Sequence, residues 1–134
     1  MALSEPAQSD ACTRGIRVRV RSQYVPERSQ PERSQWLFAY RISILNEGDE
    51  TVKLLSRHWR ITDATGQVEE VRGPGVVGEQ PVLAPGEDFE YTSSCALPTP
   101  YGQMAGTYQM ITAEGERFDA EIAPFSLAEP RAIH

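Results

Sequence analysis

Apolar and polar residues alternate along most of the chain, which is the pattern of strands that bury one face. Between residues 16 and 21, Ile16, Val18 and Val20 alternate with arginines. Between residues 36 and 44, an apolar or aromatic side chain occupies every second position, as a central half-buried strand requires. The pattern therefore predicts two strands whose apolar rows face a common core.

Further short strand-like segments follow, and most are separated by turns that contain glycine or proline. We expect strands at residues 51–55, 56–63, 67–72, 88–97, 106–113 and 117–127. No segment sustains the 3.6-residue apolar period of an amphipathic helix. Short strands with a turn every ~8–12 residues are typical of an antiparallel β-sandwich, so we predict an all-β fold of that kind. A closed barrel is the alternative.

The 134 residues suit one domain flanked by two short tails. Residues 1–14 are polar and aperiodic, so we expect a flexible N-terminal tail there, followed by a domain at residues 15–128 and a C-terminal tail at residues 129–134. Within the domain, residues 26–35 repeat Pro-Glu-Arg-Ser-Gln in tandem. Two copies are too few for a repeat architecture, so this segment is expected to be a surface loop.

Composition excludes several classes of function. With 40% hydrophobic and 24% charged residues, the chain reads as a soluble globular domain, and its net charge of -6 argues against nucleic-acid binding. No run approaches the ~20 apolar residues of a membrane span, and the N-terminus lacks the pattern of a secretory signal. Cys12 and Cys95 match no metal or redox spacing, so we expect two free thiols and a cytoplasmic protein.

A glycine-rich segment at residues 73–78 matches the dinucleotide fingerprint G-x-G-x-x-G. That fingerprint needs a following helix, and Pro81 and Pro85 stand where the helix would run, so a Rossmann site is excluded. Two interpretations remain: a turn between strands, or a loop whose backbone N–H groups hold an anion such as pyrophosphate or a nucleotide. The candidate loop residues are Arg72, Gly73, Gly75, Gly78, Glu79 and Gln80.

The densest group of functional side chains lies at residues 56–63. In a strand, His58 and Arg60 share one face, while Arg57 and Trp59 share the other. His58 has no nucleophile motif beside it and no second His or Cys spaced to bind a metal with it. We therefore expect no catalytic residue, no metal site and no cofactor. The candidate contact strand consists of Arg57, His58 and Arg60.

Two segments carry a resemblance to a known family: residues 54–63 read Leu-Leu-Ser-Arg-His-Trp-Arg-Ile-Thr-Asp, and residues 71–81 read Val-Arg-Gly-Pro-Gly-Val-Val-Gly-Glu-Gln-Pro. In these segments the chain resembles the bacterial ApaG family. Shorter matches lie at residues 83–87, 89–93, 106–110 and 125–127. Ser94 departs from the family's usual glycine and Arg28 from its common glutamine, which leaves the role of the first loop open. The resemblance implies a sandwich of the fibronectin type III and immunoglobulin-like class.

What the resemblance implies about function is a binding role. Related domains in larger eukaryotic proteins, including an F-box protein and a DNA-polymerase-interacting protein, resemble protein-binding modules. The family is linked by name to cobalt and magnesium resistance and is encoded near a dinucleoside tetraphosphatase. We therefore predict a non-enzymatic protein-interaction module, either monomer or homodimer, with an indirect link to both processes. The alternative is a small-ligand binder for pyrophosphate, a nucleotide or a divalent cation at residues 73–81.

Overall fold

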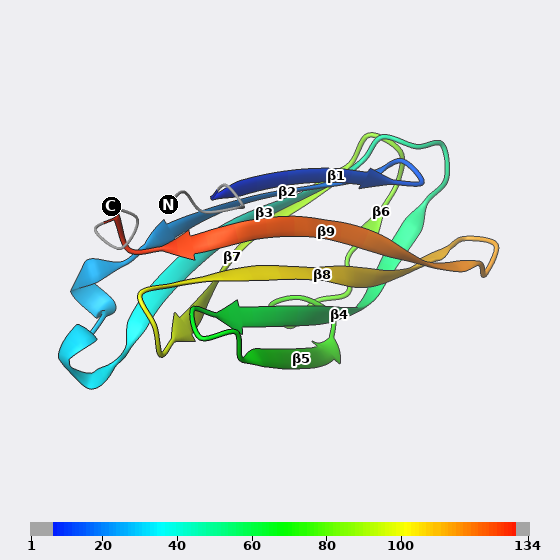
Figure 1. Ribbon diagram of the computed structural model, residues 1–134. Coiled ribbons are helices and arrows are strands. Elements are labelled where there is room, and N and C mark those ends of the chain that lie inside the picture. Colours follow the sequence, from blue (N-terminus) through cyan, green and yellow to red (C-terminus); the bar gives the residue numbers. More distant parts are fainter. Residues whose placement is uncertain (1–6, 131–134) are drawn as a thin grey trace.

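The computed structural model describes residues 7–130, and these residues are mostly β-strand (Figure 1). The strands are β1 (Gln8–Thr13), β2 (Ile16–Tyr24), β3 (Trp36–Asn46), β4 (Val52–Asp63), β5 (Val68–Pro74), β6 (Val82–Leu83), β7 (Asp88–Leu97), β8 (Tyr101–Thr112) and β9 (Arg117–Ala128). Two short 3-10 helices, η1 (Pro26–Arg28) and η2 (Pro31–Arg33), fall between β2 and β3. Within the described range no helix has the length and apolar character needed to cross a membrane.

The strands form two antiparallel sheets that face each other, so the predicted β-sandwich is confirmed. One sheet has the order β1-β2-β3-β7, and the other has the order β5-β4-β8-β9, with β6 paired to β4. The alternating apolar rows predicted for β2 and β3 fill the space between the sheets, where Ile16, Ile42 and Ile44 are fully buried. Trp59, 3% exposed, packs there against the rings of Tyr40, Tyr108 and Phe125.

Most of the predicted strands are present, and two neighbouring predicted strands are joined into one. The segments predicted at residues 51–55 and 56–63 form the single strand β4, because a bulge between Leu54 and Ser56 absorbs the change of phase. The bulge keeps Leu54 in the core and also turns Arg57 toward the inner side. β8 begins at Tyr101, earlier than predicted, and the two-residue strand β6 was too short to show a pattern.

The prediction of a flexible tail is wrong for residues 8–13, which form β1 along the edge of β2. The sequence pattern does not indicate this strand, because its inward side chains are Ser9, Ala11 and Thr13 rather than large apolar residues. β1 is held instead by its ladder with β2 and by contacts to β9, where the Glu121 N–H donates to Thr13 Oγ1. Residues 1–6 and 131–134 of the predicted tails lie outside the described residues.

The tandem repeat forms the predicted surface loop, and each copy makes the same local structure. Pro26 and Pro31 each begin a 3-10 helix of three residues, and neither helix contains a buried residue. The first copy is anchored through Ser29, whose Oγ donates to the Val25 carbonyl and accepts the Leu37 N–H. The repeat therefore sets the path of a long connection and contributes little to the core.

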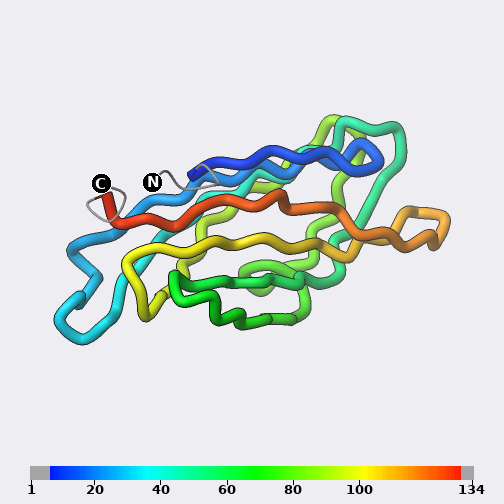
Figure 2. The backbone as a smooth tube through the Cα atoms, viewed as in Figure 1, coloured from blue at the N-terminus to red at the C-terminus, as the bar shows by residue number. Residues whose placement is uncertain are grey.

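The two long sides of the sandwich differ. On one side β9 runs beside β1 and β2 (Figure 2), and Ser22 Oγ donates to the Ser126 carbonyl across the gap. On the other side β7 and β5 are the terminal strands of their sheets. The space between β5 and β7 is therefore bounded by two sheet edges, and it contains the candidate site described next.

Candidate functional site

A pocket of about 370 Å³ lies between β7 and the segment that connects β5 to β6. This volume falls at the lower end of the range for small-molecule sites. β3, β4 and β7 each contribute inward side chains, and the glycine-rich segment contributes one wall. The lining residues are Tyr40, Arg57, Trp59, Pro74, Val76, Val77, Gly78, Tyr91 and Ser93.

Arg57 supplies the only charge among the lining residues. Its Nη1 donates to the carbonyl oxygens of Pro74 and Gly75, each at 2.9 Å. Its guanidinium lies against Gly73, where a Cβ atom would stand 3.0 Å from Nη2. Within residues 7–130 no carboxylate lies within ion-pair distance of Arg57. The pocket therefore holds a half-buried positive charge that backbone carbonyls satisfy only in part.

The glycine-rich segment is a tight two-residue hairpin turn. Val77 and Gly78 both have positive φ, at 43° and 81°, as a type I′ turn requires. Val76 and Glu79 exchange both backbone hydrogen bonds across it, and the Gly75 N–H donates to the Leu55 carbonyl. Three of the N–H groups that an anion-binding loop would present, those of Gly75, Val76 and Glu79, are thus already donated within the chain.

Hydroxyl groups form the rest of the polar lining. The hydroxyls of Tyr91 and the fully buried Tyr108 share a hydrogen bond of 2.5 Å. Burial raises the pKa of both side chains above the ordinary tyrosine value, so both stay neutral at physiological pH. Burial likewise raises the pKa of Tyr40, against the opposing effect of its hydrogen bond with Ser93.

The structure places one arginine from each predicted set, the loop and the contact strand, beside residues of the other set. Arg57, predicted as part of a contact strand, lies on the inner side of β4 beside Gly73 and Gly75. Arg72, predicted as part of the loop, lies on β5 directly across from His58 on the opposite face of the sheet. The structure therefore separates Arg57 from His58, although the two are adjacent in sequence.

The outer group is an exposed charge cluster on β4 and β5. His58 Nε2 and Glu70 Oε1 are 2.6 Å apart, and Arg72 lies 3.7 Å from the same oxygen. The hydrogen bond with His58 holds the pKa of Glu70 below its ordinary value. Arg60 pairs with Glu70 in the ladder. The charges of these four side chains neutralise one another in part. None of the four lines the pocket that contains Arg57.

The sequence did not predict the part that β3 and β7 play in the pocket. Tyr40, Tyr91 and Ser93 are inward residues of strands in which inward and outward side chains alternate. Their position in that alternation was the one signal available in the sequence. Gln80, in contrast, was predicted as a loop contact, and its Nε2 donates to the Leu55 carbonyl and so fixes the turn to β4. Glu79 is exposed beside the turn.

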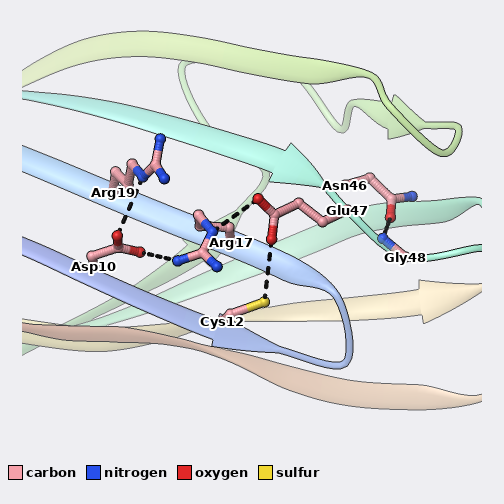
Figure 3. A network of polar contacts seen from close by, with 7 residues as sticks. All are labelled: Asp10, Cys12, Arg17, Arg19, Asn46, Glu47 and Gly48. Carbon is pink, nitrogen blue, oxygen red and sulfur yellow. Dashed lines mark hydrogen bonds and ion pairs between the residues drawn. The ribbon is translucent and has the colours of Figure 1, made fainter.

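A larger, shallower hollow of about 560 Å³ lies on the outer face of the first sheet. Of its charged lining residues, Arg19 pairs with Asp10 and Arg41 pairs with Glu90, while Arg21 has no ion pair among the described residues. Asp10 also accepts from Arg17, which reaches Glu47 beyond the hollow (Figure 3). Burial would raise the pKa of Asp10, but Arg17 and Arg19 bring it below the ordinary value. Cys12 Sγ lies 3.9 Å from Glu47 at the end of this network. The hollow is thus the surface of a salt-bridge network.

Acidic groups at one end of the sandwich do not form an open cation site. Glu50, Glu114 and Glu116 come close enough together to share an ion, but Arg14 contacts the first and the last of them, each at 3.3 Å. Glu90, an acidic residue that follows Pro85 in the sequence, is likewise paired, because it contacts Arg41.

The structure defines the class of protein: an antiparallel β-sandwich domain with a ligand-sized pocket at the edge between its sheets. The ApaG domain matches residues 26–112, and the chain belongs to the ApaG family. Protein ApaG of Rhodospirillum centenum is 60% identical over 118 residues, which cover 88% of this chain and 91% of that protein. Protein ApaG of Anaeromyxobacter dehalogenans is 54% identical over 126 residues, covering 94% and 99%.

Solved structures show the same fold. The crystal structure of an ApaA protein from Bordetella pertussis superposes with a TM-score of 0.84 at 49% identity, covering 95% of this chain and 98% of that one. The C-terminal domain of wzt superposes with a TM-score of 0.55 at 9% identity, covering 96% and 81%, and this likeness concerns the fold alone.

Proposed function

We propose that this chain is a non-enzymatic protein-interaction module whose contact surface is the side of the sandwich between β5 and β7. The observation that supports the proposal is the position of the exposed large hydrophobic side chains. Among the described residues these are Val68, Val77 and Val82, which are 45%, 54% and 57% exposed. All three fall on β5, β6 or the turn between them. Val77 borders the pocket that Arg57 lines, and Val68 and Val82 border separate hollows near opposite ends of β4. Exposed apolar side chains thus occur along the whole of this side, as in a contact surface.

The edges of the sheets offer a second means of contact. β5 and β7 each end a sheet, so each has backbone N–H and C=O groups directed away from its own sheet. An extended partner segment can pair with such an edge and place its side chains in adjacent pockets. Two hollows of about 370 and 300 Å³ lie along this side, and Val68 borders the second. Any link to cobalt or magnesium resistance, or to dinucleotide metabolism, then acts through the partner.

The proposal is tested by reversing the apolar character of this surface. Val77→Lys with Val82→Lys should remove the proteins that the unmodified chain captures stoichiometrically from bacterial lysate, as quantified by mass spectrometry. Gln23→Lys with Ala113→Lys is the matched control, because both positions are exposed and lie away from this side. Capture that is identical for the two double variants would refute the proposed surface.

The second candidate function is binding of a small ligand at residues 73–81. Arg57 favours it, since this guanidinium lines the pocket without a carboxylate partner among the described residues. The turn itself contributes little, because most of its N–H groups are donated within the chain. A panel of pyrophosphate, ATP, Mg²⁺ and Co²⁺ separates the two functions, since a ligand at ~100 times its Kd stabilises the fold by ~2.7 kcal/mol. A thermal shift that Arg57→Gln abolishes would favour the small ligand.

A further inference from the structure

We propose that Arg57 anchors a C-terminal carboxylate, carried on an apolar terminal residue of a partner chain that enters the pocket between β5 and β7. The inference rests on the proposed interaction function and names the chemical group recognised there. A free carboxylic acid presents the same group, and the experiment below distinguishes the two sources.

The described residues use only part of the hydrogen-bond donors of Arg57, which lines the pocket. A guanidinium has five N–H donors, and Nη1 gives both of its hydrogens to the carbonyls of Pro74 and Gly75. Nε and Nη2 donate to none of the described residues. These two nitrogens form one edge of the guanidinium fork, and such an edge binds the two oxygens of a carboxylate in parallel.

The fork is also held in position. Its plane lies against Gly73, where a Cβ atom would stand 3.0–3.1 Å from Nη2, Cζ and Nη1. The bonds to Pro74 and Gly75 prevent rotation about the side-chain axis. A partner that binds this group therefore does not have to order a long flexible side chain, which lowers the entropic cost of binding.

The charge of the pocket favours a monoanion. Arg57 is the only charged residue that lines it, so one carboxylate balances it fully. Pyrophosphate and nucleotides carry several charges, and they usually require more cations or free backbone N–H groups. Here the N–H groups of Val76 and Glu79 bond to each other's carbonyls, and the exposed Glu79 carboxylate adds negative charge nearby.

The apolar walls and the sheet edges favour a chain end over a free acid. Val77, which is exposed and lines the pocket, gives apolar surface for the side chain next to the carboxylate, and the nearly buried Tyr40 and Val76 lie behind it. The edges of β5 and β7 flank the entrance, so the preceding residues of an extended segment have backbone groups to pair with. A free acid would use the guanidinium without either edge.

The test uses the full chain labelled with ¹⁵N and four probes: acetyl-Ala-Val-Leu with a free carboxylate, its C-terminal amide, acetyl-leucine and pyrophosphate. The amide signals of residues 75–78 and 91–93 and the Arg57 Nε–H signal report binding. We expect the carboxylate peptide to shift these signals at millimolar concentration or below. The amide should bind about tenfold more weakly or worse, because it lacks the charge-assisted pair.

Variants separate the role of the fork from that of charge. Arg57→Gln should abolish the shifts, and Arg57→Lys, which keeps the charge and loses the fork, should weaken binding by about tenfold. Arg60→Gln is the matched control, since it removes a charge from the outer side of the same strand and should leave binding unchanged. If Arg57→Gln does not fold, Gly73→Ala displaces the guanidinium while retaining its charge, and it should also weaken binding.

Several results would overturn the inference. Equal binding of the peptide and its amide, or no shift with any carboxylate, would exclude a carboxylate anchor. Tighter binding of pyrophosphate would identify a phosphate site, and equal affinity for acetyl-leucine and the peptide would identify a site for free acids. The proposed function is tested separately, because the loss of partner capture in the Val77 and Val82 variants would stand even if no carboxylate bound.

Discussion

The guanidinium of Arg57 lies flat against Gly73, its partner across the ladder of β4 and β5. A Cβ atom at position 73 would stand 3.0 Å from Nη2 and 3.1 Å from both Cζ and Nη1, so the contact needs a residue without a side chain. Gly73 has no positive φ, and its role is therefore close approach rather than backbone freedom. One arginine and one glycine together place a positive charge in the pocket.

Gly73→Ala is expected to move Arg57 with little loss of stability. The atoms that the new Cβ would meet are the end of a flexible side chain, so the free energy of unfolding should fall by less than about 1 kcal/mol, while the Arg57 Nε–H signal shifts. Gly106→Ala is the contrasting variant, because its Cβ would stand 2.0 Å from the His58 carbonyl oxygen. We expect it to cost about 2–3 kcal/mol in urea denaturation. Equal costs would contradict this account of Gly73.

Asn46→Ala should destabilise the end of the sandwich where three loops meet. The Asn46 side chain is 1% exposed, donates to the carbonyls of Glu50 and Leu83, and accepts the Gly48 N–H (Figure 3 shows the last bond). Truncation leaves these backbone groups unpaired, so we expect a loss of about 3 kcal/mol in the free energy of unfolding. Gln23→Ala, at an exposed position, should change it by less than about 0.5 kcal/mol. A loss below about 1 kcal/mol for Asn46→Ala would show that water replaces these bonds.

Local patterns in the sequence were sufficient to predict the fold. Ile42 and Ile44 lie in an alternating row, and the structure buries both, because a sheet with one face on a core imposes a period of two. β1 was not predicted because its inward positions include Ser9 and Ala11, which do not form a row of large apolar residues. Its position depends on β2 and β9, which are distant in sequence.

The candidate site was predicted less completely, because it depends on which strands become neighbours. Parity alone placed Arg57 opposite His58, and the structure agrees. Parity could not show that Gly73 would pair with Arg57, or that Tyr91 from β7 would line the same pocket as Arg57. Those contacts arise from pairing between segments far apart in the chain, and no local pattern encodes them.

The two free thiols should differ in reactivity. Burial raises the pKa of Cys95 to about 11, with a smaller contribution from the charge of Glu69, whereas Cys12 is exposed. The thiolate is the reactive form, so at pH 8 Cys95 should react with Ellman's reagent much more slowly than Cys12. The rate of the slow phase should rise about tenfold per pH unit until the pH approaches that pKa. Cys12→Ser should remove the fast phase alone, and a single rate for both thiols would contradict the burial of Cys95.

Val77 occupies a backbone conformation that its side chain disfavours. Its φ is 43°, in the left-handed region, where a β-branched residue costs about 1–2 kcal/mol and asparagine is tolerated. Val77→Asn should therefore stabilise the fold by about 1 kcal/mol, which raises the melting temperature by about 3 °C. Because this valine is also 54% exposed beside the pocket, the same variant should weaken partner capture.

Val82→Asn is the matched control for Val77→Asn, since Val82 is 57% exposed and lies in β6 without a positive φ. It should reduce capture without raising the melting temperature, because it removes apolar contact surface and relieves no strain. If Val77→Asn stabilises the fold and leaves capture intact, the strain at this turn is unrelated to binding. If it stabilises the fold and weakens capture, the chain retains an unfavourable residue at the position where the partner makes contact.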